Sequence, residues 1–448
     1  MLSMAPSPSP PPPPPPQLSL AGLKALSVLG QGARGVVFHV LPVDAAGAAG
    51  CPASGDPMAI ALKAISRAAA RRKGAGPRGG GGGGGDDGHR RIWFERDVLL
   101  ALRHPLLPSL RGVVATDAVV GFAMDRCPGG DLKSLRRRWQ QRAETEFPDS
   151  IIRFYAAELV LALEHLHGLG VVYRDLKPEN VLIQGSGHIM LVDFDLSTTL
   201  PPPPPPPPPD ATPLRPNSPS PSSRHRKHKN RKTAMVFGCL SCSHAASPES
   251  SSSQSPPSTS RTASPASWSS SCFSSGARTP AKSNSFVGTE DYVAPEIVAG
   301  SGHDHAVDWW GLGVVLYELL YGRTPFRGRS RRETFRRVLT APPEMPGEPT
   351  PLRDLIARLL EKDPARRLGA HGVKRHTFFR GVDWDRVLDV ARPPFIPAPD
   401  DDDMAAEPEA LDVEKVVHEA FGSSATGETA PEETGSSESD YDDFSIYF

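Results

Sequence analysis

Residues 171–195 gather several polar side chains around one predicted turn. The carboxylate of Asp175 is followed by the ammonium of Lys177 and the carboxamide of Asn180, and a short predicted hairpin then leads to the carboxylate of Asp193. A carboxylate can accept the proton of an attacking hydroxyl, an ammonium can neutralise a moving phosphoryl group, and an amide with a second carboxylate can hold Mg²⁺. A single aspartate in a turn is usually a cap or a solvated residue. The whole spacing, R-D-L-K-P-E-N and then D-F, favours phosphoryl transfer.

A glycine-rich loop near the N-terminus supplies a candidate phosphate site. It lies between two predicted strands, residues 23–28 and 36–41, and glycines let backbone N–H groups approach phosphates that side chains would block. The G-x-G-x-x-G pattern also marks dinucleotide folds and ordinary turns, but dinucleotide sites run from a strand into a helix. We therefore predict an ATP-phosphate loop made of Gly30, Gln31, Gly32, Ala33, Arg34, Gly35 and Val36.

A lysine and a glutamate follow this loop. Lys63 is the one charged residue of an alternating apolar strand predicted over residues 58–65, and Glu95 lies in the first turns of a helix predicted over residues 92–102. An exposed edge lysine and a solvated glutamate are the ordinary alternatives. The place of Lys63 after the glycine loop favours a contact with ATP phosphates, and Glu95 would then hold Lys63 in position.

The elements that must position these residues are predicted from periodicity and turn signals. Pro-Gly-Gly after Met124 marks a connector that we interpret as the hinge between two lobes. Met124 is a candidate cofactor-binding residue, and Asp131 is a candidate contact for a ribose or a substrate arginine. Residues 151–169 should form an amphipathic helix that Asp149 or Ser150 can cap. Further helices are expected over residues 306–320, which are apolar enough to be buried, 331–339 and 352–360.

Three stretches are unsuited to a packed core. The Ser/Pro tract of residues 1–17 should be an extended, disordered arm, with docking to an aromatic groove as the alternative. Residues 66–91 contain a glycine run that we interpret as a flexible insertion. Residues 201–282 should be disordered, because they have too little apolar area to offset the entropy of ordering.

Two motifs inside the last stretch have a possible function. The basic run 224–232 is an import-receptor signal, a patch for anionic lipid or a solvated run, and nucleic-acid binding would show as steeply salt-dependent affinity. Cys239, Cys242 and His244 resemble half of a zinc site. They lack a second correctly spaced pair, which disfavours a metal there.

Composition limits the class of protein. The 448 residues leave room for one large two-lobed domain with extensions, and the formal net charge of −1 gives little indication of partners. The 5 scattered cysteines argue against a disulfide framework and for a reducing compartment. No apolar run reaches the ~18–20 residues of a membrane span, and the N-terminus lacks the features of a signal peptide. We expect a soluble protein of the cytoplasm, the nucleus or both, with peripheral association with the plasma membrane as a further option.

These segments together resemble the eukaryotic Ser/Thr protein kinases, and within them the AGC group and its plant-specific group VIII. Two features select the plant branch. The sequence Asp193-Phe194-Asp195 stands where most kinases have Asp-Phe-Gly, and a long insertion precedes S-N-S-F-V-G-T. Residues 392–399 and 412–418 resemble the tails of the oxidative-signal-inducible and unicorn-like members.

The resemblance implies an α+β, bilobal protein-kinase fold. The β-rich N-lobe would span residues 18–125, the helical C-lobe residues 126–380, and the AGC C-terminal tail residues 381–448. It also implies ATP and Mg²⁺ as cofactors. We expect the protein to be a monomer.

The resemblance assigns the site residues to this chemistry. The glycine loop would cover the ATP phosphates, and Lys63 would contact the α- and β-phosphates. Asp175 would be the catalytic base, with Lys177 completing its loop. Asn180 and Asp193 would bind Mg²⁺.

A regulatory device is implied as well. Arg174, next to Asp175, is typical of kinases that are switched on by a phosphate on the activation loop, which the arginine would clamp. Ser285 matches the phosphorylated position, and the family's usual upstream enzyme is the phosphoinositide-dependent kinase. Thr289 would face the catalytic loop.

Other matched positions are structural or read the substrate. Glu296 would pair with Arg367, and Asp308 would brace the backbone of the catalytic loop. Glu179 and Asp131 match acidic positions that read Arg or Lys near the target Ser or Thr of a protein substrate.

Two departures from the family pattern stand out. Asp195 replaces a glycine with freedom at φ > 0, so flipping of the metal loop would be restricted and a carboxylate is added near Mg²⁺. The terminal Phe444, Tyr447 and Phe448 fit an F-x-x-F docking motif for the upstream kinase, with Tyr in the second slot and one extra Phe. A pseudokinase scaffold is the competing hypothesis, but it would expect the loss of a catalytic residue, and none is lost.

Overall fold

The computed structural model describes residues 15–32, 34–43, 60–73, 87–141, 147–200, 282–283, 285–389 and 410–422. Several predicted features lie outside these residues. They are Ala33, the basic run 224–232, the Cys239–Cys242–His244 group, residues 392–399 and the terminal Phe444, Tyr447 and Phe448.

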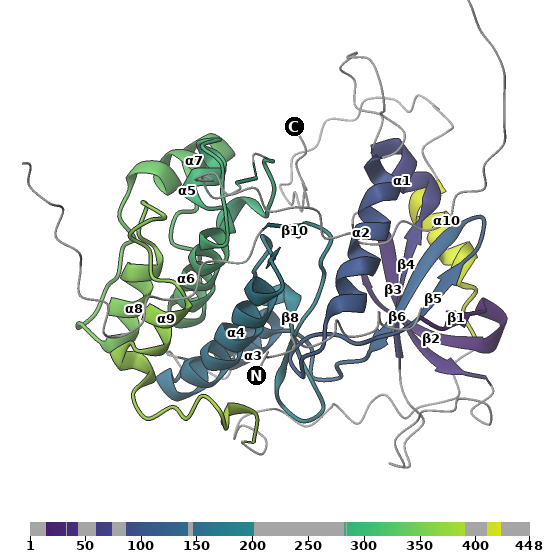
Figure 1. Cartoon of the computed structure of the whole chain (residues 1–448), viewed down its shortest axis with the longest axis horizontal. Helices are drawn as coiled ribbons and strands as arrows, with labels where there is room; N and C mark the ends of the chain where they lie inside the picture. Colours follow the sequence, from purple (N-terminus) through teal and green to yellow (C-terminus); the bar gives the residue numbers. More distant parts are fainter. Residues whose placement is uncertain are drawn as a thin grey trace, which may run out of the picture. The chain divides into compact units, whose positions relative to one another are not determined.

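The N-terminal part of the chain forms a twisted β-sheet (Figure 1). The strand order is β1-β5-β6-β4-β3-β2, with every neighbouring pair antiparallel except β1 and β5. The strands are β1 Gln17–Leu18, β2 Leu23–Gln31, β3 Gly35–Pro42, β4 Ile60–Ser66, β5 Leu110–Ala115 and β6 Val119–Asp125. Lys63 lies in the middle of β4, paired with Val37 and Phe122.

Each face of the sheet is covered by apolar residues, because successive side chains of a strand point to opposite faces. Phe122 belongs to the cluster that continues into the helical part of the chain, whereas its neighbour Ala123 belongs to a second cluster. The second cluster is closed by α10 (Val413–Gly422, yellow in Figure 1), whose Val413 and Val417 are buried.

The tail helix α10 has no counterpart in our sequence prediction. The amide N of Leu411 donates to the carbonyl oxygen of Ala25 over 2.9 Å, which adds the tail to the edge of β2. The hydroxyl of Thr116 donates to the carboxylate of Glu414 over 2.5 Å. The spacing of Val413 and Val417 places both on one helical face, and this signal was available in the sequence.

Two helices precede β5. They are α1 Arg67–Lys73 and α2 Asp87–Ala101. The flexible insertion predicted over residues 66–91 is therefore wrong at both ends. The cause at the first end is local: Ser66 Oγ accepts from Ala69 N over 3.2 Å, and the alanines that follow are good helix formers with Ala69 and Ala70 buried.

The other described residues are mainly helical, which confirms the predicted α+β class with a β-rich N-terminal part and a helical C-terminal part. The helices are α3 Leu132–Gln141, α4 Asp149–Gly168, α5 Pro295–Val298, α6 Ala306–Tyr321, α7 Arg331–Thr340, α8 Pro351–Leu359 and α9 Ala370–Lys374. The strands are β7 Val171–Val172, β8 Val181–Ile183, β9 Ile189–Leu191 and β10 Thr198–Thr199. Short 3-10 turns lie at Leu20–Gly22, Pro178–Asn180, Glu290–Tyr292, Thr377–Phe379 and Val387–Asp389.

The start of α4 differs from its predicted start. Its N-cap is Pro148, no side chain caps it, and Asp149 is already helical, so the predicted cap by Asp149 or Ser150 is wrong. The carbonyl oxygen of Pro148 instead accepts from the amides of Ile151 and Ile152.

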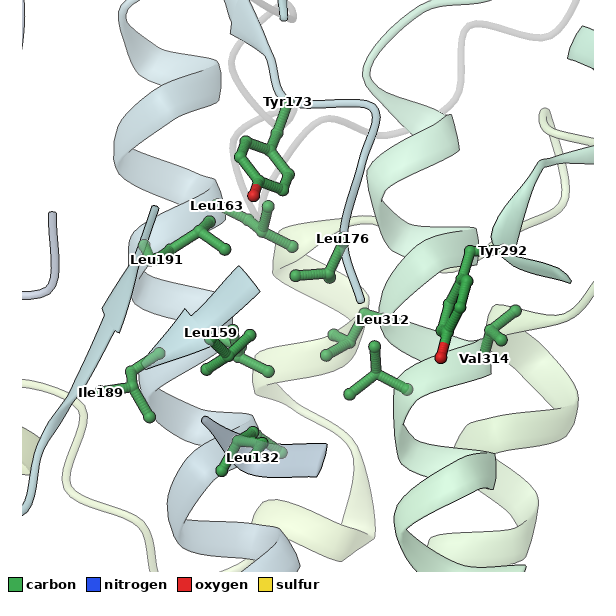
Figure 2. Packing of buried hydrophobic residues seen from close by; sticks show 14 of the residues in the cluster. Leu132, Leu159, Leu163, Tyr173, Leu176, Ile189, Leu191, Tyr292, Leu312 and Val314 are labelled. Carbon is green, nitrogen blue, oxygen red and sulfur yellow. The ribbon is translucent and has the colours of Figure 1, made fainter. Parts of the chain in front are cut away.

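The core of the helical part supports the loop that carries Asp175. Figure 2 shows Leu159 of α4 and Leu312 of α6 beneath Tyr173 and Leu176, which lie on either side of Asp175 in the sequence. The loop lies close to α6 at Leu176, because a Cβ added to Gly311 would lie 3.1 Å from Cβ of Leu176. As predicted, α6 is buried on most faces. In the part of the chain that the structure describes, no helix is long and apolar enough to cross a membrane.

Candidate active site

Lys63 joins two carboxylates that lie far apart in the sequence. Its Nζ atom is 2.7 Å from Oε1 of Glu95 on α2 and 2.7 Å from Oδ1 of Asp193, which follows β9. Burial alone would lower the pKa of Lys63, but Asp193 and Glu95 together raise it well above its ordinary value. Burial opposes ionisation of Asp193 too, yet Lys63 holds the pKa of that carboxyl below its usual range. Lys63 and Asp193 are therefore charged at neutral pH.

The carboxylate of Asp175 accepts several hydrogen bonds. Its Oδ1 accepts from the hydroxyl of Thr289 at 2.8 Å, and its Oδ2 accepts from Nδ2 of Asn180 at 3.0 Å. Nζ of Lys177 lies 3.2 Å from Asp175 Oδ2 and donates to Thr289 Oγ1 over 3.1 Å. Burial raises the pKa of Asp175, which improves its capacity to accept a proton.

The backbone around Asp175 is held in an unusual conformation by Asp308. Arg174 has φ +70°, a region that non-glycine residues rarely adopt. Oδ1 of Asp308 accepts from the amide N of Arg174 at 2.7 Å, and Oδ2 accepts from the amide N of Tyr173 at 2.8 Å. His167 Nε2 lies 2.7 Å from the same Oδ2, a contact that we did not predict. These contacts offset the cost of the strained backbone.

The donor set of Asp193 and Asn180 fits Mg²⁺. Both side chains supply oxygen atoms, and Mg²⁺ is usually bound by one or two carboxylates together with substrate phosphates. Asp193 has φ +62°, and its side chain is 41% exposed although Lys63 contacts one of its oxygens. Among the described residues there is no cluster of His, Cys, Asp and Glu large enough to hold a metal without such a substrate.

The glycine loop packs closely against β4 at Gly35. Gly30 and Gln31 end β2 and pair with Val37 and Val36, and the amide N of Gly32 donates to the carbonyl of Gly35 over 2.9 Å. A Cβ at Gly35 would lie 2.5 Å from the carbonyl oxygen of Ala64, so only glycine fits there. Arg34, just before it, forms an ion pair with Asp195.

The predicted hinge residues lie in β6 and directly before α3. Met124 is in β6, paired with Ala61 and Leu110. The carboxylate of Asp131 accepts from the amide N of Ser134 at 2.7 Å and from its hydroxyl at 3.0 Å, and thus caps α3. Asp131 also forms an isolated antiparallel bridge with Leu182, two residues after Asn180.

Arg174 reaches the segment that contains Ser285. Its Nη1 donates to Ser285 Oγ over 2.6 Å and to Ser283 Oγ over 3.3 Å. The same Nη1 is 3.2 Å from Nε2 of His303, which we did not predict. Because arginine only donates, this ring nitrogen must accept, and burial followed by Arg174 lowers the pKa of His303 to about 4. A neutral His303 therefore packs beside the arginine.

A buried ion pair fixes the end of this segment. Glu296 pairs with Arg367 at 2.6 and 2.9 Å, as predicted, and both side chains are almost fully buried.

An acidic group lies beside the catalytic loop. Glu179, four residues after Asp175 in sequence order, forms an ion pair with Lys133 of α3. Asp291 and Glu318 interact electrostatically with both of these residues, and burial raises the pKa of each of the two carboxyls. Asp291 and Glu318 were not predicted. Besides Asp308, Glu318 is the only carboxylate of the otherwise apolar α6, and its place there was the available signal.

Comparison with known proteins is consistent with this geometry. Residues 23–212 and 272–379 match the family model of the protein kinase domain. The chain is 50% identical over 402 residues to the serine/threonine-protein kinase OXI1 of Arabidopsis thaliana, covering 89% of this chain and 85% of that relative. It is 42% identical over 396 residues to the Arabidopsis kinase UCNL, with 86% of each chain covered, and 39% identical over 411 residues to the Arabidopsis kinase UCN, with 90% of each covered.

Proposed function

The chain belongs to the protein kinase family, and within it to the plant Ser/Thr kinases of AGC group VIII, in the branch of OXI1 and UCN. We propose that it transfers the γ-phosphate of ATP to Ser or Thr of proteins in a Mg²⁺-dependent reaction. The chain is a Ser/Thr protein kinase, which is a transferase that acts in signalling. The observation that carries the proposed chemistry is the simultaneous contact of Lys63 with Glu95 and Asp193.

The residues around Asp175 would perform the transfer. Asp175 accepts the proton of the substrate hydroxyl, and its bonds from Thr289 and Asn180 fix the direction of its oxygens. Lys177 is placed to offset negative charge on the transferred group. Mg²⁺, held by Asn180 and Asp193, would supply charge neutralisation at the phosphates. The glycine loop would cover those phosphates with backbone N–H groups.

Phosphorylation of Ser285 would activate the enzyme. A phosphate carries about −1.5 to −2 charges at neutral pH and makes charge-assisted hydrogen bonds with arginine. Arg174 already contacts Ser285, and its backbone precedes Asp175, so a phosphate would strengthen the link between the activation segment and the catalytic loop.

Substrates would carry Arg or Lys near the target residue. Glu179, Asp291 and Glu318 form an acidic surface next to the catalytic loop, and Lys133 neutralises part of it. An arginine of a substrate would compete with Lys133 for Glu179. Asp131, which caps α3 in this structure, is kept as a candidate contact of such an arginine or of the ribose.

Partners and location follow from segments outside the described residues. Phe444, Tyr447 and Phe448 would dock the upstream phosphoinositide-dependent kinase. The basic run 224–232 would bind an import receptor or anionic lipid, and we propose the cytoplasm, the nucleus or both as its location, with peripheral association with the plasma membrane as a further option.

The test is transfer of labelled γ-phosphate to an arginine-containing peptide. Lys63→Ala and Asp175→Asn should each abolish incorporation, while Lys415→Ala, which changes an exposed lysine of α10, should retain it. Equal incorporation in the wild type and in both site variants would refute the proposed chemistry.

A further inference from the structure

We propose that Arg34 and Asp195 form a tether that joins the glycine loop to the metal loop and positions both for the nucleotide. The proposal rests on the proposed function, since it concerns the same site. The side chains of Arg34 and Asp195 are 11% and 25% exposed, so their ion pair is shielded from solvent more than a surface pair is.

The backbone on the Arg34 side is anchored to the sheet. The carbonyl oxygen of Arg34 accepts from the amide N of Ser66 over 3.0 Å. The next residue, Gly35, lies against the backbone of Ala64 with no room for a side chain. The guanidinium of Arg34 therefore extends from a fixed point at the end of β4.

The backbone on the Asp195 side is anchored to the core. Phe194 is fully buried, and its ring contacts the ring of Tyr173 edge-on with centroids 5.5 Å apart. Asp193, on its other side, is held by Lys63. Asp195 does not have positive φ, unlike Asp193, so the side chain is gained without backbone strain.

The consequence is mechanical coupling between the glycine loop and the metal loop, which lie far apart in the sequence. The glycine loop supplies N–H groups to phosphates, whereas Asp193 would hold their metal ion. An ion pair between two anchored backbones keeps the distance between these groups constant, and it lowers the entropy that a nucleotide must remove when it binds. Arg34 is thus a positioning residue that acts through Asp195.

A double-mutant cycle on the full-length chain tests the tether. The variants are Arg34→Gln, Asp195→Asn, their combination, and the charge-exchanged pair Arg34→Asp with Asp195→Arg. The first readout is amide hydrogen exchange of residues 30–36 without nucleotide, and the second is the Kd for ADP with Mg²⁺. Arg111→Gln is the matched control, because it removes the exposed ion pair with Asp125 elsewhere on the sheet.

Each single change should speed exchange in residues 30–36 and weaken ADP binding by about three- to tenfold, as expected for a partly shielded charge pair. The combined variant should be no worse than either single one, and the charge-exchanged pair should recover most of both effects. Arg111→Gln should change neither. If Asp195→Asn does not fold, Asp195→Gly replaces it in the cycle.

Unchanged exchange in the single variants, or effects that simply multiply in the combined variant, would overturn the tether. Failure of the wild type to bind ADP would instead refute the proposed function, and the exchange measurement would still decide whether the two loops are coupled.

Discussion

The Nη1 atom of Arg174 lies 2.6 Å from the hydroxyl oxygen of Ser285, although more than half of the intervening chain is an insertion. The same guanidinium donates to the carbonyl of Leu196 over 2.7 Å, and the amide N of Arg174 donates to Asp308 over 2.7 Å. One residue therefore links the activation segment, the stretch after Asp195 and α6. Its neighbour in sequence is Asp175.

Replacing Ser285 should lower turnover. Ser285→Ala removes the proposed site of phosphate addition, and we expect kcat to fall by about tenfold or more, because hydrogen bonds to charged groups contribute roughly 1.5–3 kcal/mol. Phosphatase treatment of the wild type should cause a similar loss and should have no further effect on Ser285→Ala. Ser109→Ala, which changes an exposed serine directly before β5, is the control. Equal kcat in wild type and Ser285→Ala would show that the segment is organised without a phosphate.

The acidic surface should set the preference for basic peptides. Lys133→Ala frees Glu179, and the KM for an arginine-containing peptide should fall by about two- to fivefold, because exposed pairs contribute roughly 0.2–1 kcal/mol. Glu318→Gln should raise that KM. The KM for a peptide without arginine should not change in either variant, which separates recognition from general damage. A rise in KM for Lys133→Ala would contradict the assignment.

The stability of the fold should decrease in acid through His303. Its pKa is lowered from 6.5 to about 4, first by burial and then by Arg174, while Glu296, Asp308 and Asp304 act in the opposite direction. Because a lowered pKa means that the folded state binds the proton less well, the contribution of His303 is complete above pH 6.5 and is lost as the pH falls toward 4.

Thermal unfolding between pH 7.5 and pH 5 checks this sign. Tm should fall with pH by roughly 2–4 °C for each kcal/mol lost, and His303→Asn should show a shallower dependence than the wild type. His371→Asn, at an exposed position, should retain the slope of the wild type. His188, whose pKa is raised by its hydrogen bond to Glu158, contributes with the opposite sign, so the comparison between variants isolates His303. An unchanged slope in His303→Asn would count against a buried neutral ring.

The tail helix should be needed for the stability of the sheet. Val417→Asp places a carboxylate in the apolar cluster that covers the sheet, and Tm should fall by roughly 5–10 °C, because an unpaired buried charge costs at least a few kcal/mol. His418→Asp changes the exposed neighbour on the same helix and should have little effect. Similar Tm values for both variants would show that α10 leaves the sheet without unfolding it.

The sequence was informative where chemistry restricts both residue type and spacing. The R-D-L-K-P-E-N motif and the lysine after the glycine loop indicated which side chains should meet, and Lys63 does contact Glu95 and Asp193. The buried α6 was predictable because it is apolar on most faces. The assignment of roles to these residues stays a prediction until activity is measured.

The features that we could not predict from the sequence depend mainly on contacts between segments that are distant in the sequence. Nothing local distinguishes His303 from a surface histidine, and only the fold places it beside Arg174. The helix α1 was hidden by the arginines and glycines that surround its alanines. The capping of α3 by Asp131 also depends on the local turn geometry at Ser134, which the family pattern did not reveal.

Because Gly311 has no side chain, Leu176 can lie close to α6, and this contact determines how far the catalytic loop stands from that helix. A side chain at position 311 would require its neighbour to yield by a few tenths of an ångström. Asp175 lies one peptide unit away from that contact. A natural substitution at position 311 can therefore inactivate this enzyme by displacing the loop from its apolar side. The polar residues Lys63, Asp175 and Asp193 would all be retained in such a chain.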